Sequence, residues 1–112
     1  MDLFAGVRVA DFAAARDWYE RLLGKPPSFL PHDTEAVWTL GDQRHVYILE
    51  DRETPGRGLV TLFLEGDLDE LVADIASRGI EPAERETYST GVQKATYRDA
   101  DGNEIGFGAG PG

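Results

Sequence analysis

The fold is decided by the stretch Thr96-Tyr97-Arg98-Asp99-Ala100-Asp101-Gly102-Asn103-Glu104-Ile105-Gly106-Phe107. Its Asp101-Gly102 pair is typical of the tight turn of a β-hairpin, because glycine readily takes a positive φ. Along the strand predicted after this turn, Ile105 and Phe107 point to one face and Gly106 points to the other. Such hairpins are common. This one is informative because the predicted order of strands and helices occurs twice along the chain.

The predicted elements follow one order twice: a strand, a helix and three strands. Residues 3–9 alternate as a strand, and Asp11 caps a helix that ends at Gly24. In the second half, Asp67 caps a helix that ends at Gly79. The other strands are predicted at residues 28–30, 35–40, 44–50, 59–65, 80–85 and 91–98.

The two halves form an internal repeat. A shift of 55 residues places Gly24 on Gly79 and Pro27 on Pro82, so the exits of the two helices coincide. Between the halves lies a charged loop, residues 51–58.

The composition excludes several classes of function. A chain of 112 residues is the size of one domain, and it contains no cysteine, so disulfides and thiol catalysis are excluded. The net charge is −10, from 21 acidic and 11 basic residues, which argues against nucleic-acid binding and suits a cationic ligand. No apolar run is long enough for a membrane span and no secretion signal is present, so we expect a cytoplasmic protein without membrane contact.

Two segments resemble those of a known family. Residues 11–24, Asp-Phe-Ala-Ala-Ala-Arg-Asp-Trp-Tyr-Glu-Arg-Leu-Leu-Gly, are similar to the first-helix signature of the vicinal oxygen chelate superfamily, also called the glyoxalase, bleomycin-resistance and dioxygenase family. Residues 91–105 resemble its last hairpin, with Ala100 where the family usually has proline. The resemblance implies a single α+β domain over residues 1–112. In it, two tandem βαβββ repeats, about 1–52 and about 58–108, form curved mixed sheets around a cleft.

In metal-dependent members of that family, His, Gln or Glu side chains hold a divalent ion from the first and last strands of the two repeats. The resemblance places these four positions at Phe4, Tyr47, Leu59 and Gly106, with Val60 as the alternative to Leu59 if the register differs by one residue. Tyrosine is a poor ligand and the other three side chains have no donor atom. We therefore expect no metal, no cofactor and no catalytic residue, and neither a glyoxalase I nor an extradiol dioxygenase.

The candidate ligand-binding residues are then aromatic, apolar or hydrogen-bonding groups on the strands. Aromatic faces suit a flat or cationic organic ligand, through stacking and cation–π contacts of about 0.5–2 kcal/mol each. The predicted set is Phe4, Arg8, Trp38, His45, Tyr47, Leu59, Phe63, Tyr97 and Gly106.

Two residues of this predicted set, Arg8 and His45, are polar, and the sequence leaves more than one role possible for each. A lone guanidinium facing a cleft is costly unless it pairs with an acid or with a ligand anion, and we favour an ion pair with Glu65, Glu104 or Glu50. His45 either enters the cleft as a pH-sensitive group, since an ordinary histidine has a pKa of about 6.5, or lies at the strand edge without a role.

Three hypotheses for the function remain open. The first is a metal-free, homodimeric binding protein of the bleomycin-resistance type that sequesters a small organic molecule. The second is a lyase or isomerase that uses His45, Glu50 or Glu104 as acid–base groups, or relocated metal ligands. The third is a regulatory module whose cleft is closed by Phe4 and Leu59. An open aromatic cleft favours the first hypothesis, converging histidine and acids the second, and a filled cleft the third.

Overall fold

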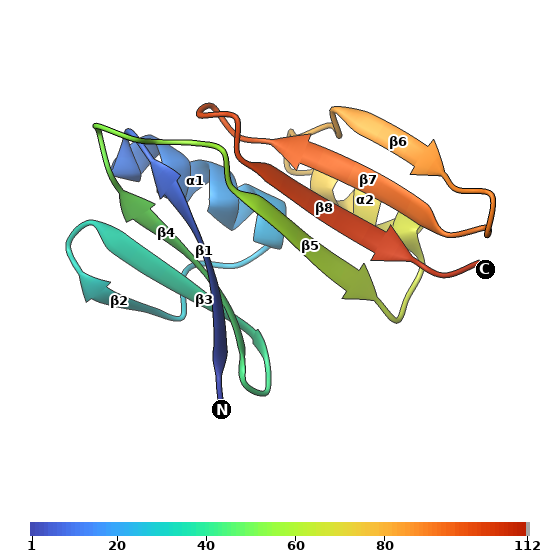
Figure 1. Cartoon of the computed structure of the whole chain (residues 1–112), viewed down its shortest axis with the longest axis horizontal. Coiled ribbons are helices and arrows are strands. Elements are labelled where there is room, and N and C mark those ends of the chain that lie inside the picture. Colours follow the sequence, from blue (N-terminus) through green and yellow to red (C-terminus); the bar gives the residue numbers. More distant parts are fainter. Residues whose placement is uncertain (112) are drawn as a thin grey trace.

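Two βαβββ units lie side by side in the computed structural model, which describes residues 1–111 (Figure 1). The first unit contains β1 (Leu3–Val9), α1 (Phe12–Leu23), β2 (Phe29–His32), β3 (Glu35–Gly41) and β4 (Arg44–Glu50). The second unit contains β5 (Leu59–Leu64), α2 (Leu68–Ala76), β6 (Glu84–Thr87), β7 (Gln93–Arg98) and β8 (Glu104–Ala109). The α+β fold with two βαβββ units is therefore confirmed. Within the described part of the chain, neither helix has the length and apolar character needed to cross a membrane.

Each unit forms one four-stranded mixed sheet, with strand orders β1-β4-β3-β2 and β5-β8-β7-β6. The first strand of each unit pairs in parallel with the last, and the other neighbours are antiparallel. In Figure 1 both helices lie behind the sheets, the front faces are uncovered, and β1 and β5 run next to each other at the centre. We call these two uncovered faces the open faces.

Both helices begin at an aspartate, as predicted. The Asp11 carboxylate accepts a hydrogen bond from the Ala14 amide at 3.1 Å, and that of Asp67 accepts one from the Asp69 amide at 2.8 Å. These caps satisfy amides that the first helical turn leaves without a partner. Gly24 follows α1 with a φ of 78°, a left-handed conformation that glycine adopts without strain.

The strand β6 differs most from its prediction, because it spans Glu84–Thr87 and not residues 80–85. Ile80 is only 7% exposed and packs into the core, and Pro82 has no amide hydrogen for a sheet. Backbone pairing therefore begins later, where the Ala83 amide donates to a carbonyl of β7 at 2.8 Å.

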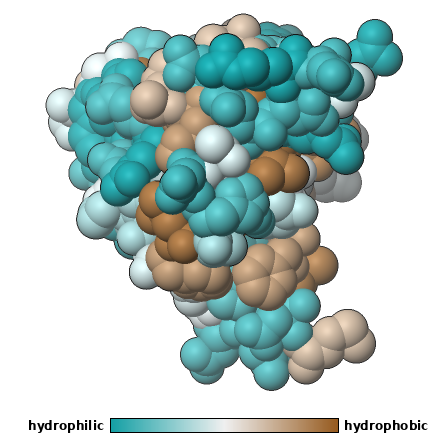
Figure 2. Space-filling model, turned by 90° about the vertical axis from the view of Figure 1, so that its left-hand side faces the viewer, coloured by the Kyte–Doolittle hydropathy of each residue, from teal (hydrophilic) through white to brown (hydrophobic). Residues whose placement is uncertain are grey.

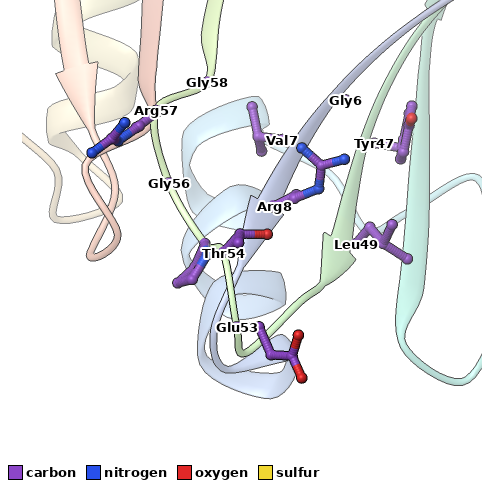
Figure 3. A pocket seen from close by; sticks show the side chains of 11 residues that line it. Gly6, Val7, Arg8, Tyr47, Leu49, Glu53, Thr54, Gly56, Arg57 and Gly58 are labelled. Atoms are coloured by element: carbon purple, nitrogen blue, oxygen red, sulfur yellow. The ribbon is translucent and has the colours of Figure 1, made fainter.

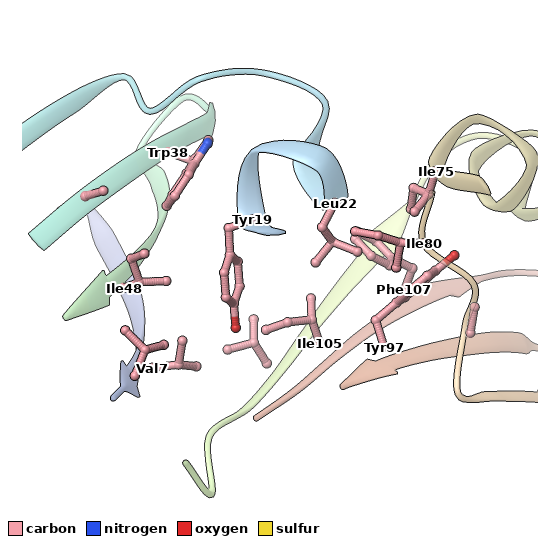
Figure 4. Close-up of a cluster of buried hydrophobic side chains, with 14 of the residues drawn as sticks. Val7, Tyr19, Leu22, Trp38, Ile48, Ile75, Ile80, Tyr97, Ile105 and Phe107 are labelled. Carbon is pink, nitrogen blue, oxygen red and sulfur yellow. The ribbon is translucent and has the colours of Figure 1, made fainter. Parts of the chain in front are cut away.

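One hydrophobic core spans both units, between the sheets and the helices (Figure 4). Tyr19 of α1 lies between Ile48 of the first sheet and Ile105 of the second. All three residues are at most 1% exposed. Because burial of a side chain of this size contributes about 1.5–3 kcal/mol, this shared core holds the two units against each other.

Trp38 and Tyr97 belong to this core, so the prediction that they line the cleft is wrong. Both are 0% exposed, and Nε1 of Trp38 donates to the carbonyl of Lys25 at 2.9 Å. The reason is the alternation of side chains along a strand. Trp38 pairs with Val46 and Tyr97 pairs with Ile105, which both face the helices.

A buried carboxylate lies at the turn between β7 and β8. Asp99 is 8% exposed and accepts a hydrogen bond from the hydroxyl of Tyr19 at 2.8 Å and from the amides of Asp101 and Asn103 at 2.9 Å. Burial raises the pKa of Tyr19 far above its usual value, and the charge of Asp99 raises it further. The phenol therefore stays protonated and remains a donor to the carboxylate.

Asn103 extends this network to the first unit. Its Nδ2 donates to Asp99 and to the carbonyl of Arg8 in β1, both at 2.8 Å, and its Oδ1 accepts from the amide of Gly58 at 2.7 Å. The side chain thus joins the hairpin, β1 and the segment between β4 and β5. Since Asn103 is 0% exposed, water cannot replace these partners.

We expect Asn103→Ala to lower the free energy of unfolding by about 3 kcal/mol, because it leaves the Gly58 amide without its partner and removes one donor from the Arg8 carbonyl and one from the buried Asp99 carboxylate. Tyr19→Phe should cost about 2 kcal/mol, since Asp99 keeps its other donors. Urea unfolding measures both values. A loss below about 0.5 kcal/mol for Asn103→Ala, the size of an ordinary surface substitution, would contradict the role given to the network.

Candidate functional site

The open faces carry seven of the nine residues predicted to bind a ligand. On the first sheet, Phe4 lies opposite His45 across β1 and β4, while the residues that alternate with them, such as Val7 and Val46, are buried against the helix. The seven residues are Phe4, Arg8, His45, Tyr47, Leu59, Phe63 and Gly106. Trp38 and Tyr97 lie on the opposite, helix-covered faces. The structure thus brings the seven to one side of the molecule, and their role in binding stays a prediction.

An aromatic patch, formed by Phe4, His45 and Tyr47, covers part of the first sheet. The rings of Phe4 and His45 are stacked with centroids 4.2 Å apart, and Tyr47 meets Phe4 edge-on at 6.4 Å. Nε2 of His45 lies 2.9 Å from a carboxylate oxygen of Asp2, and Nδ1 lies 2.9 Å from the hydroxyl of Thr39. Because both ring nitrogens are engaged and Phe4 stacks on the ring, the His45 side chain is only 9% exposed and mainly supports the ring of Phe4.

Tyr47 lies flat across β1 because residue 6 is glycine. A Cβ atom at Gly6 would lie 2.2 Å from Cζ of Tyr47, closer than any real contact. The second sheet has a similar arrangement, since a Cβ at Gly108 would lie 3.1 Å from the ring of Phe63. Glycines on one strand therefore let aromatic rings of the neighbouring strand rest on the open faces.

Large apolar side chains on the open faces are exposed to solvent. Phe4 is 47% exposed, Phe63 is 65% and Leu59 is 72%. From the side of the first sheet, Figure 2 shows a hydrophobic patch just below the middle of the molecule, with mostly hydrophilic surface above it and at the lower end. Phe4 and Leu59 therefore stand on an open, partly apolar surface of the single chain.

A cavity of about 680 Å³ lies at one end of the first open face (Figure 3). Its floor comes from β1 and β4, and its other wall is the segment that joins the two units. The lining residues are Gly6, Val7, Arg8, Tyr47, Leu49, Glu53, Thr54, Pro55, Gly56, Arg57 and Gly58. The sequence predicted this segment only as a charged loop, because nothing local showed that it folds back over β1.

Arg8 pairs with Asp51, and the prediction of a glutamate partner is wrong. Nε of Arg8 lies 3.3 Å from Oδ2 of Asp51. The loop brings Asp51 there through backbone hydrogen bonds, because its amide donates to Val9 at 2.8 Å and the Gly56 amide donates to Arg8 at 3.0 Å. The hydroxyl and then the amide of Thr54 lower the pKa of Asp51, and the charge of Arg8 is the smallest of the contributions.

A second groove, of about 690 Å³ and more apolar, lies between the two units. Leu22 and Leu40 line it from the first unit, and Leu62, Leu71 and Phe107 line it from the second. The sequence did not predict this groove, because it exists only through the relative placement of the units.

The residues at the family's four metal positions do not fit a metal ion. Phe4, Leu59 and Gly106 supply no donor atom, so the phenol of Tyr47 would be the only side-chain ligand. Within residues 1–111, no cluster of three or more His, Cys, Asp or Glu side chains has a metal-binding arrangement.

Comparisons with known proteins identify the family to which the chain belongs. The model of the Glyoxalase/Bleomycin resistance protein/Dioxygenase superfamily matches residues 3–107, so the chain belongs to this family. A crystal structure described as a glyoxalase / bleomycin resistance protein from Catenulispora acidiphila is 51% identical, with 99% of each chain covered and a TM-score of 0.94. No curated protein matches the chain significantly.

More distant structures share the fold. A bleomycin-binding protein complexed with bleomycin is 20% identical over 97% of this chain and 98% of its own, with a TM-score of 0.78. A lactoylglutathione lyase from Agrobacterium tumefaciens is 15% identical over 99% of this chain and 94% of its own, with a TM-score of 0.81. Binding proteins and enzymes thus use this fold, and the side chains of the site must decide between them.

We expect Gly6→Ala to displace the ring of Tyr47 from β1, since the new methyl group would overlap it. The measurement is NMR: the ring resonances of Tyr47 should shift, and its contacts with residue 6 should disappear. Gly66→Ala is the matched control, because a Cβ at Gly66 has no atom within 4 Å. Unchanged Tyr47 resonances in Gly6→Ala would show that the ring does not rest on this glycine.

Proposed function

We propose that this protein binds and sequesters a small, flat organic molecule on its open sheet faces, without a metal at the family's four ligand positions. One observation carries the proposal. Phe4, Tyr47 and Leu59 take three of those positions on the open faces, and they offer aromatic or apolar surface in place of donor atoms. The aromatic patch suits stacking with a flat or cationic ligand, because ring faces attract both.

An enzyme of the lyase or isomerase type is the competing function. It would need an acid–base group that reaches the ligand. Both ring nitrogens of His45 are already engaged by Asp2 and Thr39. Glu104 lies near Arg98, at 3.8 Å, and Glu50 accepts a hydrogen bond from the Phe12 amide at 3.1 Å. These contacts favour binding over catalysis.

We further propose that the functional form is a homodimer with two equivalent clefts. The two open faces of one chain lie side by side and do not enclose a ligand (Figure 1). Phe4, Leu59 and Phe63 expose much of their apolar surface there. A second copy packed over these faces would bury them, which is the main favourable term in protein association.

Native mass spectrometry of the freshly purified protein tests the function, with bleomycin, other aromatic compounds of positive, neutral and negative charge, and divalent metal ions as the panel. We expect a metal-free dimer that takes up two copies of one compound. Phe4→Ala should weaken this uptake about tenfold, which corresponds to the loss of one stacking contact. Tyr88→Ala is the matched control, because Tyr88 is similarly exposed, at 43%, but lies outside the strands.

A different result would favour the competing function. If each cleft instead takes up one transition-metal ion that survives passage through a chelating column, the metal-free proposal is wrong. Equal loss of uptake in Phe4→Ala and Tyr88→Ala would place the ligand elsewhere.

We expect Leu59→Glu to convert the dimer into a monomer, because the substitution puts a charge into the proposed apolar contact. Sedimentation velocity measures the change. Ala13→Glu is the control, since Ala13 is exposed on α1, away from the open faces. A monomeric wild-type protein, or a dimeric Leu59→Glu variant, would rule out this interface.

A further inference from the structure

We propose that the ligand carries an anionic oxygen group, a carboxylate or a phosphate, and that Arg8 binds this group at the loop end of the first open face. The inference rests on the proposed function, because it specifies the ligand of the same face. It also differs from the expectation drawn from the overall charge, which suited a cationic ligand.

The charge next to the cavity is close to balanced, unlike the strongly acidic charge of the whole chain. Acidic residues outnumber basic ones by 21 to 11 in the sequence. The charged residues that line the cavity are Arg8, Arg57 and Glu53, two cations and one anion. Asp51, 3.3 Å from Arg8, adds a second anion, so two cations face two anions there. Because solvent screens charges more than about 8–10 Å away, the many distant carboxylates of the chain do not exclude an anionic ligand at this place.

Arg8 is available to a ligand because its present partner is held by other groups. The carboxylate of Asp51 accepts hydrogen bonds from the amides of Glu53 and Thr54, both at 3.1 Å, and from the hydroxyl of Thr54 at 2.7 Å. Arg8 approaches it only through Nε, at 3.3 Å. Asp51 can therefore keep its place while the guanidinium turns to another anion.

The terminal nitrogens of Arg8 point toward open space. The side chain is 62% exposed, and no hydrogen bond or ion pair within residues 1–111 uses either Nη atom. These two nitrogens form the planar fork that matches a carboxylate or a phosphate. The chain contains many carboxylates, so a lack of possible partners does not explain why these two nitrogens are free.

The position of Arg8 also fits the aromatic patch. In Figure 3 its guanidinium extends over the sheet toward Tyr47, and Leu49 lies farther along the same strand as Tyr47. A ring stacked on Tyr47 would place an anionic substituent within reach of Arg8. Arg57 extends to the other side of the joining segment, so it adds to the positive field without sharing the anion. The ligand class is therefore an aryl carboxylate or an aryl phosphate.

The test is an NMR titration of ¹⁵N-labelled protein with four probes: benzoate, phenyl phosphate, benzyl alcohol and benzyltrimethylammonium. We expect the two anions to bind more tightly than the neutral and cationic probes, with shifts at the amides of Gly6, Arg8 and Gly58. The tighter of the two anions identifies the group as a carboxylate or a phosphate.

Four variants separate the role of Arg8 from the general charge. Arg8→Gln should weaken anion binding at least tenfold, Arg8→Lys should weaken it less because the charge remains, and Arg57→Gln should weaken it less than threefold. Arg52→Gln is the matched control: it removes the same charge from an exposed side chain that pairs with Glu50 and does not line the cavity. We expect it to bind as the wild type does.

Three outcomes would overturn the inference. They are equal anion affinity in Arg8→Gln and Arg52→Gln, tighter binding of the cationic probe, and no saturable shift at up to about 10 mM of either anion. If anion affinity does not depend on Arg8 while the neutral or cationic probe still binds the Phe4 and Tyr47 face, this inference is wrong and the proposed function stands.

Discussion

The hydrogen bonds of two buried side chains, Asp99 and Asn103, hold the tertiary arrangement together. Asp99 receives the hydroxyl of Tyr19 from α1, while Asn103 reaches the carbonyl of Arg8 in β1 and the amide of Gly58. A buried carboxylate is tolerated only when its oxygens accept several hydrogen bonds. Replacing any one of these partners therefore lowers the stability of the fold. The network thereby fixes the second unit against the first, and the two open faces end up on the same side of the molecule.

The path of the joining segment follows from this constraint and creates the cavity. A Cβ at Gly58 would lie 2.5 Å from Val7 and 2.7 Å from Oδ1 of Asn103, so only glycine lets the chain pass this close. Gly56 then donates to the carbonyl of Arg8, which keeps the segment over β1. The segment between β4 and β5, which these contacts hold in place, therefore forms one wall of the candidate site.

The character of the site follows from the side chains on the open faces. The resemblance to metal-dependent members of the family places Phe4, Tyr47, Leu59 and Gly106 at the positions of the metal ligands. In the proposed function, ring surface replaces coordination there, and Arg8 is the cation next to that surface. The net charge of −10 describes how the whole molecule behaves at long range, whereas selectivity for a ligand depends on groups within a few ångströms.

The sequence by itself determined the order of elements, the helix ends at Asp11 and Gly24, and the face on which Phe4 points, because caps, turns and strand alternation are local. It did not show which way Trp38 points, because Ala36, Val37 and Trp38 form a continuous apolar run whose alternation cannot be read from the residue types. The tertiary structure alone decided that Tyr97 faces a helix, that Arg8 meets Asp51, and that a cavity forms beside it. These features depend on contacts between distant segments, such as Asn103 with Gly58, and no local pattern encodes such contacts.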